Sequence, residues 1–494
     1  MGIEPSAVAR VVGIETIYQD LREGNILFLP QRIAVVGQGS TSSVYDTTKR
    51  QVTSAFEVGT TYGFGSPLHL AAMQLFPTNG DGVGTIPVTI YPLEDDLAGV
   101  AASGDITPGG APTEAASYIV RINNIDSEQF VISFGDSVAD IVTAMTNAIN
   151  AVIEMPIIAT DSATQVDLAT KWKGTNANNI VVEVVGSTTA GNTFAITQPV
   201  GGLINPDIQG ALNQIGNVWE SLILNCLDIN DGTALDAYSV FGEGRWGALV
   251  KKPLIVFTGN TATTMLDATT VSDARKTDRT NVQLVAPGSK DLFFVVAARE
   301  LSRIAIVANS NPPRDYGSQP ATGLTPGIDG EQWDYITRDA AVKKGSSTIE
   351  VKDSVVNLSD TITFYHPSGD PLPAYRFVCD IIKLQNVIFN LDLEFKNTKW
   401  DGAPLIPDGD PTVNPDAKKP KNAVSAANVI IDSLALNAIL SDPATAKKKT
   451  VCTINSQNPK RSDLKVTVQL SGNNNITSFD LNFGYFFGSI SPIV

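Results

Sequence analysis

The chain has 494 residues, of which 51 are Asp or Glu and 35 are Lys or Arg, so its formal net charge is −16. This acidity argues against nucleic acid and anionic membrane as partners, because both select basic surfaces. No apolar run approaches the ~18 residues that a membrane span needs, so no membrane insertion is expected. Three widely spaced cysteines predict no disulfide framework. The two histidines, His69 and His366, are too isolated to predict a catalytic site, a metal site or a cofactor.

The first 24 residues favour an extended arm over a folded domain. β-branched side chains recur in this stretch, and no turn signal follows that would fold it back. Fifteen extended residues span about 50 Å at roughly 3.3 Å each, which is enough to reach a neighbouring subunit. We therefore expect residues 7–20 to link subunits through Val8, Val11, Val12, Ile14 and Ile17.

Residues 25–94 are predicted to begin an α/β core. A buried stretch at 26–36 ends in a strand, RIAVVG, at Gly37. In residues 67–76 apolar side chains recur at spacings of three and four, which predicts a helix, and residues 85–91 alternate as a strand. The order strand, helix, strand is typical of an α/β unit with a parallel pair of strands.

The same α/β rhythm returns in residues 204–330, so we expect both stretches to form one core around an insertion. The expected elements are a helical face from Leu212 to Leu222, a helix at 233–250, strands at 252–257 and 281–286, a helix at 291–309 and a long loop at 311–330.

Residues 95–203 are predicted to form the insertion, a small protruding α+β domain of the order β-β-α-β-β. Residues 94–117 have the Gly- and Pro-rich composition of a linker. Ser137 and Asp140 fit a capping box ahead of a helix whose apolar residues keep a 3.6-residue period. The four strands are expected at 118–123, 129–134, 165–172 and 179–185.

Residues 331–463 are predicted to form a C-terminal α+β domain. The expected elements are strands at 347–351 and 360–365, a helix or strand at 376–390, a proline-rich loop at 401–423, and a helix at 424–440 that ends before Asp442-Pro443. The expected fold class is therefore an α/β core with an inserted small α+β domain, a C-terminal α+β domain, and extended N- and C-terminal arms.

Residues 464–494 are predicted to be a strand followed by the second linking arm. Leu464, Val466, Val468 and Leu470 alternate with polar residues. Chain ends are usually polar, yet large apolar side chains continue here: Phe479, Leu481, Phe483, Tyr485, Phe486 and Phe487. Burial within the same subunit would account for them. A neighbour that accepts the segment as an added strand would account for them as well, and we expect residues 464–487 to link subunits.

The remaining motifs are weak signals for binding. Gly37 and Gly39 follow a strand but lack the third glycine of a dinucleotide fingerprint. Acidic residues at 94–96 and 401–416 lack EF-hand spacing, so solvated loops are favoured over calcium sites. Three consecutive lysines, Lys447, Lys448 and Lys449, lie near Lys418, Lys419 and Lys421 in an acidic chain. They fit a solvated face or a contact with an acidic partner.

Several stretches resemble the contractile tail sheath proteins of Mu-like bacteriophages. In the insertion these are GGAPTEAASYIVRINN, GDSVADIVTAMTNAIN and DLATKWKGTNANNI. Further along they are VVAARELSRIAIVANSNPP, VVNLSDTITFYHPSG and LNFGYFFG. The resemblance covers most of the chain and includes no catalytic motif.

This resemblance implies a structural subunit that is not an enzyme. Sheath subunits form hexameric rings in a helical stack around a tail tube, are joined by strand-adding arms, and contract to drive the tube through the host envelope. The implied partners are further copies of the chain, the tail tube protein, and baseplate and tail terminator proteins. The implied location is the virion, after assembly in the host cytoplasm. Lys447, Lys448 and Lys449, with the helix at 424–440, are then expected to face the tube.

Three other interpretations stay open on the sequence. The chain could be the sheath of a related contractile injection or secretion system, which would share the fold and the arms. It could be a soluble α/β carboxylate-dependent hydrolase, which needs two acids facing one cleft. It could also be a monomeric carbohydrate-binding or adhesion protein, which would not need an aromatic end.

Overall fold

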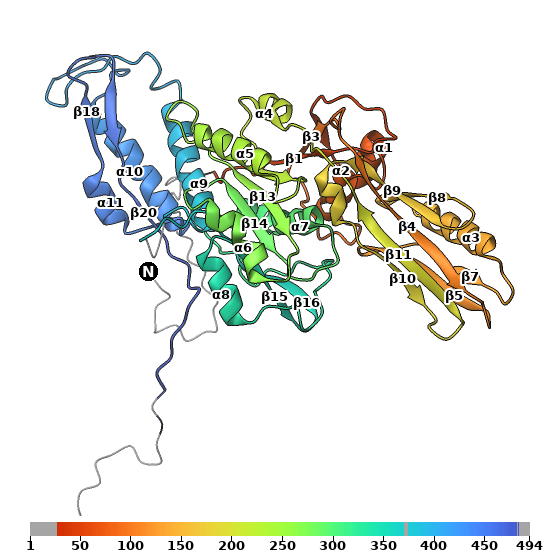
Figure 1. Ribbon diagram of the computed structural model, residues 1–494. Helices are drawn as coiled ribbons and strands as arrows, with labels where there is room; N and C mark the ends of the chain where they lie inside the picture. Colours follow the sequence, from red (N-terminus) through yellow and green to blue (C-terminus); the bar gives the residue numbers. More distant parts are fainter. Residues whose placement is uncertain (1–26, 370–373, 482, 484–494) are drawn as a thin grey trace, which may run out of the picture.

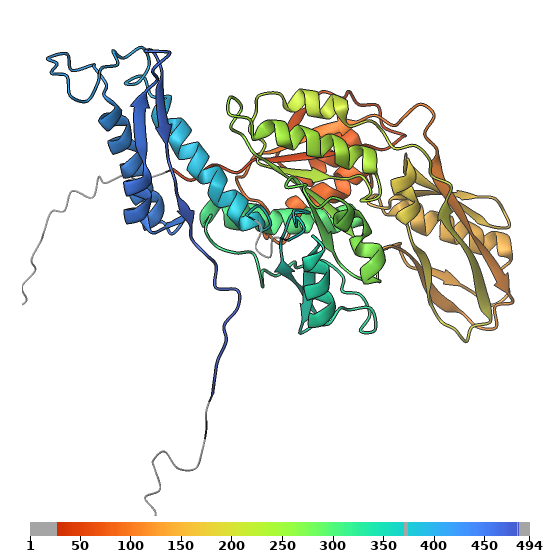
Figure 2. The same cartoon turned by 60° about the vertical axis from the view of Figure 1, so that its left-hand side comes forward.

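The computed structural model describes residues 27–369, 374–481 and 483. A central sheet with its helices lies between two smaller parts (Figures 1 and 2). The insertion extends from one side of this centre, and the C-terminal helices and hairpin lie on the other.

The central sheet has eight strands in the order β16-β15-β14-β13-β12-β1-β3-β2. Neighbours from β3 to β15 are parallel, whereas β2 and β16 are antiparallel edges. The parallel pairing of β1 with β3 confirms the α/β unit expected at the start of the core. The bounds are β1 Ile33–Gln38, β2 Arg50–Val52, β3 Val88–Leu93, β12 Leu222–Asn225, β13 Ile255–Asn260, β14 Asn281–Val285, β15 Ser347–Lys352 and β16 Val355–Asp360.

Helices cover both faces of this sheet, so its central strands read as nearly continuous apolar runs. In β1, Ile33 and Val35 belong to the core shared with α2 and α7, whereas Ala34 and Val36 belong to the core shared with α4 and α5. Helices α6 and α8 pack on each other beside β14 and β15. The bounds are α1 Ala55–Tyr62, α2 Pro67–Leu75, α4 Gln209–Ile215, α5 Gly232–Arg245, α6 Met265–Ala274, α7 Phe293–Ser310 and α8 Tyr335–Lys343.

Two predicted elements of this region are wrong. The helical face from Leu212 to Leu222 is instead α4, a turn and β12: α4 ends at Ile215, and Gly216 follows with a φ of 53°. Apolar spacing cannot separate these cases, because a short helix and a buried strand both carry apolar residues. The strand expected at 360–365 lies at 355–360, and neither α6 nor α8 was predicted.

The insertion consists of two antiparallel sheets and one helix. One sheet has the order β11-β4-β9-β8; in the other, β10, β6 and β7 surround β5, and α3 packs against strands of both. The capping box of Ser137 and Asp140 that opens α3 is confirmed. The bounds are β4 Ala101–Gly110, β5 Ala116–Ile122, β6 Ile125–Asp126, β7 Phe130–Ile132, α3 Val138–Ala151, β8 Ile157–Asp161, β9 Val166–Lys173, β10 Val182–Gly186 and β11 Asn192–Val200.

The expected β-β-α-β-β order has too few strands, and the linker expected at 94–117 is wrong. A long strand, β4, runs through this Gly- and Pro-rich stretch. Its Pro108 lies beyond Ile106, where β4 pairs with β11 alone, so the missing N–H can face the unpaired side. Gly104 lies where an added Cβ would be 2.3 Å from the Thr197 carbonyl oxygen. The residue limits of the domains stay predictions.

The C-terminal part combines helices α9 Val378–Phe395, α10 Pro420–Leu436 and α11 Pro443–Lys449 with two short strand pairs. Residues 376–390, expected as helix or strand, lie mostly in α9. Helix α10 begins inside the expected loop, because Pro420 at its first position is already set for a helix. The strand expected at 464–471 is two strands with different partners. Strand β19 (Ser462–Lys465) pairs with β18 (Val451–Ile454), and β20 (Gln469–Leu470) pairs with β17 (Leu440–Ser441).

Candidate assembly surface

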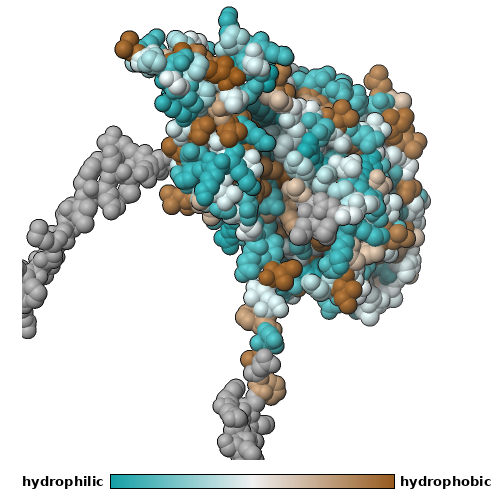
Figure 3. Space-filling model, turned by 90° about the vertical axis from the view of Figure 1, so that its left-hand side faces the viewer, coloured by the Kyte–Doolittle hydropathy of each residue, from teal (hydrophilic) through white to brown (hydrophobic). Residues whose placement is uncertain are grey.

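The chain after β20 leaves the body as an extended segment (Figures 1 and 2). Phe479, Leu481 and Phe483 in this segment are 82–87% exposed. Alternate residues of an extended chain point to the same side, so an extended segment places Phe479 and Leu481 on one apolar edge. Figure 3 shows the segment standing clear of the surface, with hydrophobic residues along it. Several large apolar side chains exposed together indicate a surface that contacts another molecule.

The predicted linking residues just before this segment are half-buried against their own chain. Leu464 pairs with Cys452 across the β18–β19 hairpin, and Val466, Val468 and Leu470 pack against a cluster that includes Ile431 and Leu434 of α10. These contacts favour residues from 474 onward as the linking segment. The other predicted arm residues lie outside the described part of the chain: Val8, Val11, Val12, Ile14, Ile17, Tyr485, Phe486 and Phe487.

The β18–β19 hairpin offers open strand edges. Among the described strands, β18 and β19 pair only with each other, so each keeps one edge with unpaired backbone groups. A two-stranded ribbon is marginal alone, and here α10 packs against it. Such an edge can accept an extended segment as a further strand.

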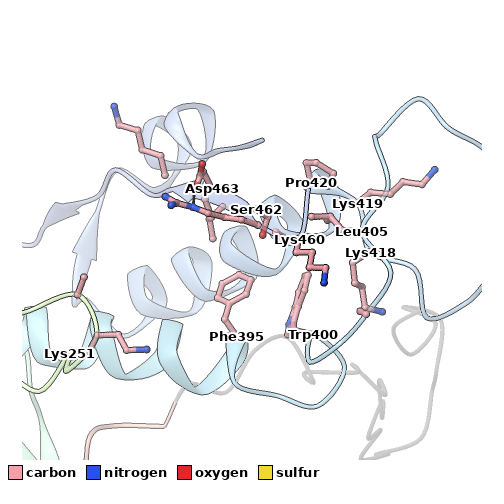
Figure 4. A pocket seen from close by; sticks show the side chains of 16 residues that line it. Lys251, Phe395, Trp400, Leu405, Lys418, Lys419, Pro420, Lys460, Ser462 and Asp463 are labelled. Carbon is pink, nitrogen blue, oxygen red and sulfur yellow. Dashed lines mark hydrogen bonds and ion pairs between the residues drawn. The ribbon is translucent and has the colours of Figure 1, made fainter. Parts of the chain in front are cut away.

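A cavity of about 850 Å³ lies between the end of α9, the start of α10 and this hairpin. Phe395 and Trp400 form its apolar side, with ring centroids 5.0 Å apart, and Lys460 reaches in from the hairpin (Figure 4). Six cationic side chains line the cavity: Lys251, Lys418, Lys419, Lys460, Arg461 and Lys465. This basic lining contrasts with the net charge of −16.

Some of these cations are already paired. Lys251 forms an ion pair with Asp392, and Arg461 lies 2.5 Å from an Asp463 carboxylate oxygen. By contrast, Lys418, Lys460 and Lys465 have no ion-pair partner within the described residues. An apolar wall beside unpaired ammonium groups can hold a segment that carries both a carboxylate and an aromatic side chain.

The three consecutive lysines form the last turn of α11. Lys447 lies 2.7 Å from an Asp432 carboxylate oxygen of α10, while Lys448 and Lys449 are exposed. On the same helix α10, Val429 is 53% exposed and Leu436 is 84% exposed. Lysines at the C-terminus of a helix interact favourably with the helix dipole. The exposed lysines of α11 and the exposed apolar residues of α10 are compatible with a contact to an acidic partner.

The titratable groups singled out by the sequence have structural partners. Burial and the nearby Lys171 lower the pKa of His69 to about 4, and its Nδ1 accepts a hydrogen bond from the Gly65 N–H at 3.1 Å. The Nε2 of His366 lies 3.3 Å from a carboxylate oxygen of Asp273. In the part of the chain that the structure describes, no cluster of His, Cys, Asp or Glu could hold a metal ion.

The acidic stretches at 94–96 and 401–416 have separate partners as well. Asp95 accepts a hydrogen bond from the Gln38 side chain at 2.5 Å, and Asp408 accepts one from the Lys421 backbone at 3.0 Å. Across the described residues, we find no helix of the length and apolarity that a membrane crossing requires.

Comparison with known proteins finds a curated relative that is a tail sheath protein. No protein-family model matches the chain. The Mu-like prophage FluMu tail sheath protein of Haemophilus influenzae is 24% identical over 346 residues, which are 68% of each chain. The resemblance to Mu-like tail sheath proteins is confirmed.

Solved structures similar to this chain are also sheath proteins. The sheath tail protein of Desulfitobacterium hafniense aligns with a TM-score of 0.46 and 12% identity over 90% of this chain and 93% of its own. That of Listeria innocua aligns with a TM-score of 0.48 and 11% identity over 90% and 92%. The sheath of an extracellular contractile injection system in its contracted state aligns with a TM-score of 0.48 and 10% identity, over 97% of this chain and 99% of its own.

The basic cavity is the part of the candidate assembly surface that the sequence did not predict. Its lining comes from three separated stretches, around Lys251, 395–423 and 460–465. The pair Lys460-Arg461 was the available signal, but nothing local shows that it faces Phe395 and Trp400. The predicted lysines 447–449 do not line the cavity.

Proposed function

We propose that the chain is a structural subunit of a contractile phage tail sheath. Copies would form hexameric rings stacked helically around a tail tube and would contract to drive the tube through the host envelope. The observation that carries this proposal is the exposure of Phe479, Leu481 and Phe483 in the segment after β20, in a chain that also has an open hairpin edge among its described strands. The tail sheath relative from Haemophilus influenzae supports the same role. Such a subunit is a virion component assembled in the host cytoplasm and is not an enzyme.

The two features are complementary between copies. An extended segment satisfies its backbone groups by pairing with the edge of β18 or β19, and its apolar side chains are covered at the same time. Because the donor and acceptor are different surfaces, each copy contacts the next through a heterologous contact, which builds rings or open helices. The segment at 1–24 would act as the second arm.

Contraction in this proposal needs no nucleotide or metal. The extended sheath would be held by a kinetic barrier, and additional burial between rigid subunit bodies would supply the energy when the baseplate opens. The arms would keep the copies connected while the bodies slide. Other implied partners are the tail tube, baseplate and tail terminator proteins.

Electron microscopy of the purified full-length chain tests the proposal directly. Negative-stain images across a range of concentration and salt are expected to show long hollow tubes with a helical lattice. If only compact particles form, the tail tube protein is added as a template. Compact particles in the presence of that tube protein would contradict the sheath role.

The lysines of α11 provide a second test, of the tube-facing surface. We expect the triple variant Lys447→Glu, Lys448→Glu and Lys449→Glu to form empty sheaths normally but to lose at least tenfold in assembly on the tail tube, because three cations become anions on a surface proposed to contact an acidic partner. Co-sedimentation with tubes at several salt concentrations measures the loss. Assembly on tubes at the normal level would place the tube contact elsewhere.

A matched control reverses lysines of similar exposure away from this face. Lys343 of α8 and Lys352 of β15 are exposed and pair with local acids. Their double Glu variant changes the net charge by −4, against −6 for the triple variant, and tests whether charge reversal elsewhere on the surface has the same effect. We expect this control to assemble on tubes as the unmodified chain does.

A further inference from the structure

Helix α9 buries polar side chains where apolar ones would be expected. Lys383, Gln385 and Asn386 are fully buried, and Asn390 is 5% exposed. Burying such groups is costly unless they are hydrogen-bonded. Each of the four has a partner from a segment distant in sequence. These partners explain why the polar groups are tolerated in the helix.

Lys383 holds the chain at the point where the C-terminal segment leaves the body. Its Nζ donates to the Ser471 carbonyl oxygen at 2.7 Å and to Asn473 Oδ1 at 2.6 Å, and Asp380 lies 3.0 Å away. The Asn473 Nδ2 also donates to the Pro313 carbonyl oxygen at 2.8 Å. Residues 474–481 and 483 are exposed, so the exposed segment starts directly after this contact.

Asn386 and Asn390 hold the other end of the described chain. The Leu29 N–H donates to Asn386 Oδ1 at 2.8 Å, and Asn390 Nδ2 donates to the Leu27 carbonyl oxygen at 3.0 Å. Residues 27–29 follow directly on the predicted N-terminal arm. We call residues 27–29 and 471–473 the N-root and the C-root.

The side chains that hold the two roots lie on one face of one helix. Positions 383, 386 and 390 are spaced i, i+3 and i+7, which aligns them along a helix, and they span about 10 Å of its axis. Figures 1 and 2 show α9 between the central sheet and α10. The two roots are 442 positions apart in sequence (471 − 29), yet a short stretch of α9 joins them.

We propose that α9 is the junction that ties the two linking arms of each subunit together. The transfer of load between copies rests on the proposed sheath function, whereas the contacts of α9 with the two roots do not. Tension between neighbouring copies passes from one arm to the other through Lys383, Asn386 and Asn390. Because α9 packs on the core of the central sheet through Val378, Ile381 and Ile382, the junction and the subunit body move together as one unit while the arms remain connected.

Hydrogen exchange on the full-length chain, kept dilute before assembly, tests whether α9 holds the roots. We expect Asn386→Leu to speed exchange of the Leu29 amide about tenfold and Lys383→Met to do the same in residues 471–475, because each loses a buried hydrogen bond. Each change should leave the other root at its normal rate. The control Lys396→Met removes an exposed lysine just after α9 and should change neither.

Two milder variants serve if a buried substitution prevents folding. Asn473→Ala removes the side chain through which the C-root contacts Lys383, and Asn390→Leu removes the donor to the Leu27 carbonyl oxygen of the N-root. Normal exchange at both roots in all four variants would overturn the junction. This measurement needs no assembled sheath, so its failure is distinct from a failure of the proposed function.

The load path is tested on assembled tubes. Tubes of Asn473→Ala and of Asn390→Leu are each expected to dissociate at a lower urea concentration than tubes of the unmodified chain or of Lys396→Met. The double variant should be no weaker than the weaker single variant, because the two roots act in series. Fully additive losses, or losses no greater than in the control, would overturn the load path. If the unmodified chain forms no tubes even on the tail tube, the proposed function fails, while the exchange result still judges the roots.

Discussion

Deleting residues 474–494 is expected to leave a folded monomer that forms no tubes. The described part of this segment, residues 474–481 and 483, is exposed, and Phe479, Leu481 and Phe483 have lost little of their accessible surface to the body. The body therefore loses little stability with the segment. A neighbour would lose both the backbone pairing and the burial of several large side chains, each worth about 1.5–3 kcal/mol when fully buried. Electron microscopy and sedimentation measure the loss of assembly.

A triple substitution separates the effect of losing the apolar side chains from the effect of shortening the chain. Phe479→Ser, Leu481→Ser and Phe483→Ser together keep all backbone groups and should still abolish tubes. The matched control, Asn474→Ala with Asn475→Ala, changes exposed polar residues of the same segment and should assemble normally. The circular dichroism spectra of the deletion, the triple serine variant and the double alanine control should match that of the unmodified chain. Normal tubes from the deletion would refute the C-terminal arm, as normal tubes after deletion of residues 1–20 would refute the N-terminal one.

The central sheet was predictable where a single physical pattern dominates. Its parallel strands are buried on both faces and appear in the sequence as short apolar runs. Helix α7 keeps apolar residues at helical spacing over its whole length. Strand β4 was not predictable, because its glycines and Pro108 have the composition of a linker. The reasons it is a strand, the close approach at Gly104 and the missing neighbour beside Pro108, exist only in the folded sheet.

The candidate assembly surface was predictable only in its exposed part. The aromatic run from Phe479 onward is a local signal, and the structure places its described members in solvent. Val466 and Val468 alternate in the same way, yet they pack on α10 of their own chain. Alternation shows that one side is covered but not by which molecule. Lys383 and Asn386 gave no signal, because their partners lie about 90 and 360 positions away in the sequence.

Replacing Glu300 with methionine is expected to stabilise the folded chain by about 1–3 kcal/mol, the range for a buried polar group without a partner. Glu300 is fully buried in α7, and neither carboxylate oxygen has a hydrogen-bond partner among the described residues. The neighbouring Arg299 does not pair with it; its guanidinium binds Asp81. Methionine has a similar volume and no group that requires a partner.

The same residue predicts a pH dependence of stability. Burial raises the pKa of Glu300 well above its ordinary value of 4.5. As pH rises above 4.5, the carboxyl ionises in the unfolded chain while it stays protonated in the folded chain, so the free energy of the unfolded state falls relative to that of the folded state. Folding stability should therefore fall with rising pH, by about 1.4 kcal/mol per unit, until the raised pKa is reached. Urea midpoints of the transition that unfolds the central sheet, measured between pH 5 and 8, report the slope.

Glu300→Gln separates the charge from the polarity of this side chain. The amide does not titrate, so the variant should lose the same pH slope as Glu300→Met, but it keeps unpaired polar atoms and should gain less stability. Glu128→Gln is the matched control, because Glu128 is exposed, and its urea midpoints should follow those of the unmodified chain. A slope that persists in Glu300→Gln would mean that other groups cause it, and a loss of stability in Glu300→Met would mean that Glu300 has a partner in the folded chain.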